Sequence, residues 1–171
     1  MLTKDLLFAP ARKNQLSLAL SLLAEAARRL QNKNTQQWAF WINPPAHKVT
    51  WIKEGFAAGE FYFVYTKGEL VGMFRLLYFD EKYWGHRKDR FDSAAYVHSL
   101  TVRDAYVGRG IGALILQKIE RQLKAEGIAI FRLDCMYENE NLCNYYRNQG
   151  FLPVEVTEID GVQQQLFEKN L

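Results

Sequence analysis

Apolar positions recur at helical spacing near the start of the chain. Leu16, Leu20, Leu23, Ala27 and Leu30 lie three or four residues apart, which is the period of an amphipathic helix. The stretch also has the basic and then apolar order of a secretion signal, but the helical spacing continues through Arg28 and Arg29, past any cleavage site. We therefore predict a core helix. Its apolar run is too short to span a membrane, which takes about 20 residues.

The helical pattern breaks at 31–45, where Asn and Pro residues indicate a loop. The aromatic residues Trp38, Phe40 and Trp41 in this loop either line a substrate site or seal the edge of a sheet, and large rings more often belong to a core. A second helix is predicted over 46–58, ending at Gly59. Two helices thus precede the main strands.

Strand patterns fill the middle of the chain. The runs at 60–66, 69–79 and 94–102 are rich in aromatic and β-branched residues, and Lys67 and Gly68 separate the first two as a hairpin turn. The charged segment 80–93 is predicted as a loop, and loops of this length are often functional.

The remaining pattern alternates between helices and strands. It predicts a helix over 111–126, a buried strand over 128–136 and a helix over 139–149. Two final strands, 151–156 and 162–168, flank a turn at Asp160 and Gly161. A weak strand near Asp5 to Phe8 would begin the sheet.

Composition narrows the functional classes. A chain of 171 residues with 49% hydrophobic and 24% charged residues fits one domain, 1–171, with a sizeable core. The net charge is only +3 and no block of basic residues occurs, so no nucleic-acid partner is expected. Cys135 and Cys143 lack partners at metal-ligand spacing, so we expect buried, reduced thiols, a cytoplasmic protein and no metal.

Three glycines follow the strand predicted at 94–102. Gly108, Gly110 and Gly112 alternate with Arg109 and Ile111, where a helix begins. Glycine lets backbone N–H groups approach a ligand closely, and a helix N-terminus adds unpaired donors with a partial positive charge. The turn therefore suits an anionic phosphate, and Arg109 adds a full charge. The alternative is a turn that needs glycine only for its backbone angles.

The same glycines permit a dinucleotide-binding hypothesis. Gly108, Gly110 and Ala113 satisfy G-x-G-x-x-A. Asp134 follows them in the sequence at about the separation at which a dinucleotide-binding fold places its ribose-binding acid. That fold needs several successive strand-helix units, whereas one helix pattern and two short strands follow Asp134. A dinucleotide-dependent oxidoreductase is therefore the less favoured hypothesis.

Two segments resemble motifs of the GNAT superfamily of N-acetyltransferases. VHSLTVRDAYVGRGIG resembles motif A, whose Q/R-x-x-G-x-G/A turn falls on Val107 to Gly112; Gly110 and Gly112 match, whereas Val107 stands where the family has Gln or Arg. LDCMYENENLCNYYRNQGFLPV resembles motif B, N-x-x-A-x-x-L-Y-x-x-x-G-F. The matching residues there are Asn139, Leu142, Tyr145, Tyr146, Gly150 and Phe151. The chain is identified as a member of this superfamily, specifically over 94–153.

The resemblance implies an α/β (α+β) fold with a central mixed, mostly antiparallel sheet, flanking helices, and splayed strands four and five. It implies acetyl-CoA as cosubstrate and no metal. The backbone of Leu100, Thr101 and Val102 would hold the pantetheine and thioester. The pyrophosphate would be held at Val107, Gly108, Arg109, Gly110, Ile111 and Gly112. Asn139 would contact the pantetheine arm or, equally, act only as a helix N-cap.

Two residues are candidates for proton transfer. Tyr146 stands where many family members carry the general acid, and a phenol is protonated at pH 7 and can donate to the departing thiolate. Packing in the core is its alternative role. VHSLTV also resembles the arylalkylamine N-acetyltransferases, which have a histidine at the position of His98 and another where this chain has Tyr96. Strand alternation puts His98 on the face of Leu100, so His98 is the candidate base or, alternatively, a buried structural histidine.

The resemblance thus implies an enzyme that transfers an acetyl group from acetyl-CoA to a primary amine of a small molecule or protein, by direct attack on the thioester. A non-catalytic acyl-CoA-binding module is the alternative. No segment indicates one acceptor over another. A homodimer is compatible with the resemblance, and no membrane partner is expected.

Overall fold

The computed structural model describes residues 6–33, 35–87 and 93–171. They form two compact units, each built from two chain segments. The first unit contains the described residues up to Arg75 and Ser99–Ile115, and the second contains those of Leu76–His98 and Leu116–Leu171.

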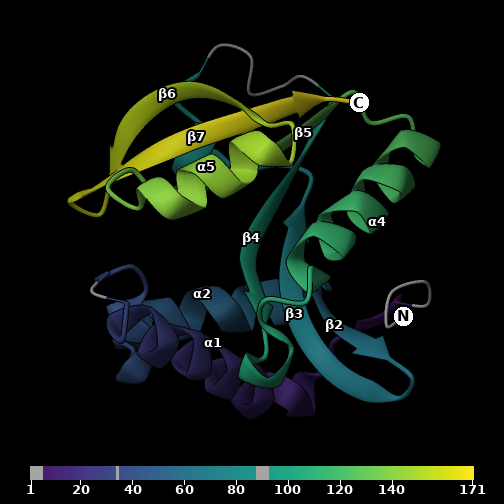
Figure 1. Ribbon diagram of the computed structural model, residues 1–171, viewed down its shortest axis with the longest axis vertical. Coiled ribbons are helices and arrows are strands. Elements are labelled where there is room, and N and C mark those ends of the chain that lie inside the picture. The colour runs from purple at the N-terminus through teal and green to yellow at the C-terminus, as the bar shows by residue number, and fades with distance from the viewer. Residues whose placement is uncertain (1–5, 34, 88–92) are drawn as a thin grey trace. The chain divides into compact units, whose positions relative to one another are not determined.

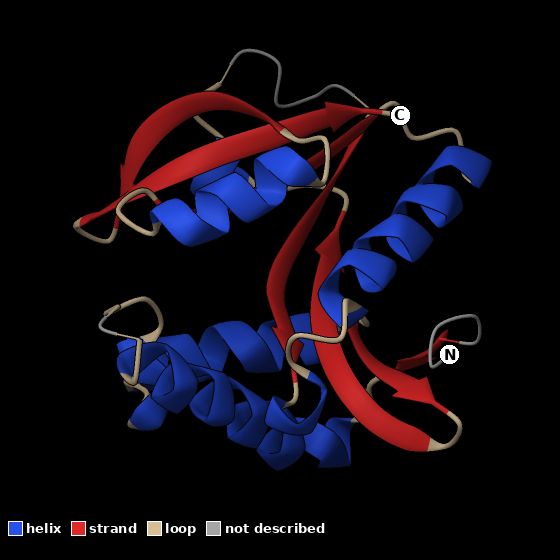
Figure 2. Cartoon of the chain, in the orientation of Figure 1, coloured by secondary structure: helices blue, strands red, loops and turns tan. Residues whose placement is uncertain are grey.

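Apart from one short helix between the third and fourth strands, helices and strands follow one another in the predicted order (Figures 1 and 2). In chain order they are β1 (Leu6–Pro10), α1 (Leu16–Gln31), α2 (Ala46–Ala57), β2 (Phe61–Thr66), β3 (Glu69–Leu77), α3 (Glu81–Trp84), β4 (Ala94–Val102), α4 (Ile111–Ala125), β5 (Ile130–Met136), α5 (Glu140–Asn148), β6 (Leu152–Ile159) and β7 (Val162–Asn170). Short 3₁₀ turns cover Lys13–Gln15, Ala39–Ile42 and Asp104–Tyr106. None of the described helices combines the length and apolar character that crossing a membrane requires.

The strands form a mixed sheet in the order β1-β2-β3-β4-β5-β7-β6. The pairs β1–β2, β2–β3, β5–β7 and β6–β7 are antiparallel. Strands β4 and β5 are parallel and pair over Ala94–Val97 and Ile130–Leu133. This topology confirms the predicted fold class. It contradicts the dinucleotide-binding alternative, which needs a succession of parallel strands.

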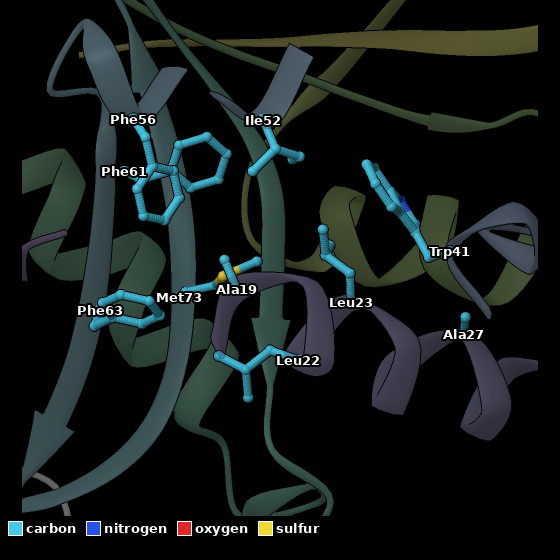
Figure 3. Close-up of a cluster of buried hydrophobic side chains, with 10 residues drawn as sticks. All are labelled: Ala19, Leu22, Leu23, Ala27, Trp41, Ile52, Phe56, Phe61, Phe63 and Met73. Atoms are coloured by element: carbon cyan, nitrogen blue, oxygen red, sulfur yellow. The ribbon is translucent and has the colours of Figure 1, made fainter. Parts of the chain in front are cut away.

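The core of the first unit lies between α1, α2 and strands β2 and β3 (Figure 3). Small and large apolar residues of α1 alternate at helical spacing, so the helix buries one face against the strands. The buried set is Ala19, Leu22, Leu23, Ala27, Trp41, Ile52, Phe56, Phe61, Phe63 and Met73. The helix predicted near the N-terminus is thus confirmed as a core helix. Of the loop aromatics, Trp41 is buried, Trp38 packs against the core and Phe40 is 38% exposed.

Both predicted hairpins are present. Lys67 and Gly68 have φ angles of +49° and +81°, and Asp160 and Gly161 have +52° and +77°. Two consecutive left-handed residues favour the tight turn whose twist matches the flanking antiparallel strands. The β2–β3 and β6–β7 connections were therefore readable from the sequence.

The segment predicted as a loop at 80–93 needs a correction. It contains the helical turn α3, whose N-cap is Asp80; the Asp80 side chain accepts a hydrogen bond from the Tyr83 amide at 3.1 Å. Trp84 at the end of this turn is fully buried in the core of the second unit, together with Leu77, Ala94, Tyr96 and Leu166. Burial of a large ring therefore orders a segment whose charge pattern indicated a loop. Residues 88–92 of the predicted loop lie outside the described residues.

Candidate active site

The turn between β4 and α4 presents unpaired backbone N–H groups. Gly108 and Gly110 have φ angles of +77° and +75°, and no heavy atom outside the adjacent residues lies within 4 Å of a Cβ placed on either residue. Among the described residues, the amides of Gly108, Gly110, Ile111, Gly112 and Ala113 have no hydrogen-bond acceptor. Such donors at the positive end of a helix dipole can bind an anionic group.

Neighbouring contacts in the first unit hold this turn. The Asp104 amide donates to Glu25 of α1 at 2.6 Å, and the Asp104 carboxylate pairs with Arg29. The Arg109 guanidinium lies 5.5 Å from the ring centre of Tyr106. Val107 is 40% exposed and has no side-chain donor, so Arg109 is the side chain of this turn that can add positive charge.

Strand β4 contains a backbone irregularity at Ser99. The φ angle of Ser99 is +53°, which is unusual for a residue other than glycine. Ser99 lies two residues after Val97, the last β4 position in the register with β5. The left-handed conformation interrupts strict strand alternation, as in a β-bulge. The predicted shared face of His98 and Leu100 assumed unbroken alternation, so strand periodicity does not carry it across Ser99 and it stays a prediction.

The residues after Ser99 in β4 are the predicted pantetheine-binding positions. Leu100 and Val102 are half-buried, whereas Thr101 is buried and its hydroxyl has no hydrogen-bond partner within the described chain. A Cβ on Gly72 of β3 would lie 2.3 Å from the Thr101 carbonyl oxygen. Glycine at position 72 therefore permits the close approach of the two backbones.

His98 lies between two carboxylates in the second unit. Its Nε2 atom is 2.6 Å from Oδ2 of Asp80, and its Nδ1 atom is 3.3 Å from Oδ1 of Asp134. The Tyr83 ring covers the imidazole, with 4.7 Å between ring centroids. The side chains of His98, Asp80 and Asp134 are only 8%, 5% and 10% exposed. We call these three residues the histidine-carboxylate cluster.

Burial shapes the titration of this cluster. Desolvation raises the pKa of Asp134 to about 6; the charge of His98 opposes this shift and the charge of Asp80 adds to it. Burial also raises the pKa of the Tyr83 phenol, and Asp134, Asp80 and Asp160 raise it further. A carboxyl group that titrates near neutral pH can exchange protons with an imidazole.

Tyr146 lies on the buried face of α5. Its ring packs against Phe151 and Phe167, with centroid separations of 6.2 and 5.8 Å. Burial raises the pKa of Tyr146 well above its ordinary value, followed in size by the effects of Cys135 and Asp134. The hydroxyl makes no hydrogen bond to any residue that the structure describes. Tyr146 is therefore a neutral phenol whose proton is not engaged elsewhere.

Asn139 caps α5. Its side-chain oxygen accepts a hydrogen bond from the Leu142 amide at 3.1 Å. The N-cap role is thus confirmed, and the contact with a pantetheine arm stays a prediction. The cap fixes the start of the helix that carries Tyr146.

Cys135 and Cys143 are both buried, and their Sγ atoms are 3.5 Å apart. Burial raises the pKa of the Cys135 thiol, and Cys143 adds to the shift. A buried thiol with a raised pKa is a poor nucleophile. The two residues therefore pack as expected, as small groups of the core.

Comparison with known proteins identifies the family. Residues 21–151 match the sequence profile of the Acetyltransferase (GNAT) family. The chain belongs to this family. It is an N-acetyltransferase, and the resemblance read from the two motifs is confirmed.

Relatives of this acetyltransferase match over most of its length. The uncharacterized N-acetyltransferase YesJ of Bacillus subtilis is 28% identical over 157 residues, which are 88% of this chain and 82% of YesJ. A GNAT-family acetyltransferase from Listeria monocytogenes is 22% identical, with a TM-score of 0.79 over 97% of this chain and 95% of that one. The PaiA N-acetyltransferase from Thermoplasma acidophilum in complex with coenzyme A is 16% identical, with a TM-score of 0.63 over 98% of this chain and 100% of that one. The two structures share the fold of this acetyltransferase.

Sequence reasoning missed the acidic partners of His98. Asp134 becomes apparent only with the register of the parallel strands, in which Val97 pairs with Leu133 and the next residues are His98 and Asp134. Asp80 carried no such signal. Its position depends on the turn α3 and on the burial of Trp84, which no local pattern indicates.

Proposed function

We propose that this acetyltransferase moves the acetyl group of acetyl-CoA to a primary amine of a small molecule or protein. The amine attacks the thioester directly, with His98 as base and Tyr146 as acid. The observation that carries the proposal is the Tyr146 hydroxyl, which belongs to a side chain in the core and donates to no described residue. A departing thiolate needs a proton, and a phenol that burial keeps neutral can supply it.

We assign the CoA pyrophosphate to the turn Gly108–Gly112 and the pantetheine arm to the backbone of Leu100, Thr101 and Val102. The unpaired amides of the turn support the first assignment. The motif resemblance supports the second, in which an extended arm pairs with a strand. Arg109 would add charge to the phosphate contacts.

Four proton transfers balance the reaction. The imidazole of His98 takes a proton from the substrate ammonium, and the neutral nitrogen attacks the carbonyl carbon to form the C–N bond. When the C–S bond breaks, the Tyr146 hydroxyl gives its proton to the thiolate. The tyrosinate recovers a proton from the new, still positively charged nitrogen, and His98 releases its proton to solvent. The products are the amide and free CoA.

The test is a thiol-release assay with acetyl-CoA and a panel of primary amines. For the best amine, Tyr146→Phe is compared with the parent in single-turnover experiments, so that product release cannot mask chemistry. We expect Tyr146→Phe to be slower by about 10²-fold or more, because general acid catalysis contributes at least that much. Tyr145→Phe is the matched control, since its half-buried ring lies 5.6 Å from that of Tyr146.

Two outcomes would contradict the proposal. An unchanged single-turnover rate in Tyr146→Phe would leave Tyr146 only a packing role. CoA binding by calorimetry without thiol release from any amine would indicate a non-catalytic binding module.

A further inference from the structure

The imidazole of His98 faces an acid at each ring nitrogen, from two different elements. Asp80 stands at the N-cap of α3 and Asp134 lies in β5. We propose that both are positioning residues for His98: Asp80 keeps a proton on Nε2, and Asp134 shares the proton at Nδ1. The proton-accepting group is then the His98–Asp134 pair. This inference rests on the proposed function only for its effect on catalysis.

Asp80 is held so that it can set the tautomer. Its Oδ1 atom accepts the Tyr83 amide at 3.1 Å, while Oδ2 lies 2.6 Å from Nε2 of His98. An ionised carboxylate only accepts hydrogen bonds, so Nε2 must be the donor. The neutral ring therefore carries its hydrogen on Nε2 and leaves the Nδ1 lone pair facing Asp134.

The turn that carries Asp80 is anchored deep in the second unit. Trp84 is fully buried, and the guanidinium of Arg132 lies 4.5 Å from its ring centre. Arg132 donates to the Tyr96 hydroxyl at 3.1 Å and pairs with Glu168 at 3.4 Å. Tyr96 and Arg132 face each other in the β4–β5 register, two residues before His98 and Asp134. Asp80 is thus fixed against the strands that carry the other two members of the cluster.

Asp134 completes the pair at Nδ1. Its Oδ1 atom is buried and has no aligned hydrogen bond to a described residue, although Nδ1 of His98 is 3.3 Å away. A bare nitrogen and an ionised oxygen would be two acceptors facing each other, which is unfavourable in a buried site. A proton between them removes this conflict, either as imidazolium with carboxylate or as imidazole with carboxylic acid. The raised pKa of Asp134, about 6, makes both forms accessible near neutral pH.

The surroundings contain other titratable groups. Those that face the cluster or its covering ring are Tyr83 and Lys82 of α3, Asp160 of the β6–β7 turn, Cys135 of β5 and Tyr146 of α5. Lys82 pairs with Asp160 at 2.6 Å, so this ion pair lies outside the cluster. Within the described part of the chain, no group of three or more His, Cys, Asp or Glu residues is arranged to hold a metal ion. The two nitrogens of His98 instead serve two separate acids.

The direct test is ¹⁵N NMR of the full chain with labelled histidine. The chain has three histidines, and His98→Gln identifies the His98 ring signals by their absence. We expect the parent's neutral ring to show a protonated Nε2 and a bare Nδ1. In Asp80→Asn the amide can donate to Nε2, so the tautomer should reverse. In Asp134→Asn the ring should titrate at a pH lower by about one unit or more, because an opposite charge beside the ring is lost.

Asp160→Asn is the matched control, since it removes a carboxylate that lies in the same unit but outside the cluster. Asparagine also tolerates the left-handed backbone at position 160. The control should leave both the tautomer and the titration of His98 unchanged.

The catalytic readout is the pH profile of single-turnover acetylation at saturating acetyl-CoA and low amine. Asp134→Asn should move the acidic limb to lower pH, and Asp80→Asn should slow the reaction by about 10²-fold or more with the KM for acetyl-CoA unchanged. Asp160→Asn should resemble the parent.

The ring signals and the rates separate two kinds of failure. A parent protein whose His98 ring has a bare Nε2 would overturn the inference, and this measurement needs no variant. An Asp134→Asn protein whose His98 ring titrates at the same pH as in the parent would also overturn it. The expected ring signals together with an unchanged pH profile in His98→Gln would support the roles of Asp80 and Asp134 and contradict His98 as the base.

Discussion

Oδ2 of Asp80 lies 2.6 Å from Nε2 of His98, although 18 positions separate the two residues in the sequence. The contact depends on a single helical turn, because Asp80 caps α3 through its other oxygen. One carboxylate thus joins the start of a short helix to the ring of the candidate base. Changes at this contact should therefore act on the protonation of His98.

His98→Gln should slow acetyl transfer at neutral pH by about 10²-fold or more and remove the acidic limb that belongs to the enzyme. In the parent, the acetylation rate falls at low pH because His98 becomes protonated and can no longer accept a proton from the amine. The measurement is single-turnover acetylation across pH with several amines. His86→Gln is the control, because His86 is 44% exposed and pairs with Glu155. A limb that persists and follows the pKa of each amine would exclude His98 as the base.

Asp134→Asn should change how stability depends on pH. Burial raises the pKa of Asp134 from 3.8 to about 6, so the folded protein holds this proton more tightly than the unfolded chain. The resulting stabilisation is fully present below pH 3.8 and is lost as the pH rises through about 6. The variant has no carboxyl group at this position and does not lose this stabilisation. Its free energy of unfolding relative to that of the parent should therefore increase between pH 3.8 and about 6. Urea unfolding across pH measures the difference, and parallel curves would contradict the pKa shift.

Gly110→Val should weaken CoA binding. A side chain at a φ of +75° strains the backbone and covers the unpaired amides of the turn. Gly161→Val is the control for strain alone, because Gly161 has a φ of +77° and equally open space around its Cβ position. Calorimetry with CoA compares the two. Equal, parent-like affinity in both variants would show that the pyrophosphate binds elsewhere.

Asn139→Ala should lower the free energy of unfolding by about 1 kcal/mol, because the Leu142 amide loses its acceptor. Asn139→Asp should keep the cap and most of this stability. Denaturant titration tests both. The CoA affinity of Asn139→Asp then tests the predicted contact with the pantetheine arm. If the side-chain amide of Asn139 makes that contact, CoA should bind more weakly to this variant although the protein remains stable.

The glycine turn and α5 show how much of the site was readable. Gly108 and Gly110 were recognised because left-handed backbone angles restrict the residue type at those positions. Asn139 and Tyr146 were recognised through their positions in the second family motif, which covers one short helix. These features depend on residues close together in sequence. That residues 1–171 form one domain remains a prediction.

The sequence by itself determined the order of the elements other than α3, both hairpin turns, the core face of α1 and the two family motifs, since each is encoded in the spacing of neighbouring residues. Only the tertiary structure decided the surroundings of His98. The left-handed Ser99 breaks an alternation that the sequence pattern assumes. Asp80 reaches His98 because Trp84 is buried beside Arg132, and Asp134 reaches it because β4 and β5 pair in one register. Contacts of this kind follow from packing between distant segments, which no local periodicity records.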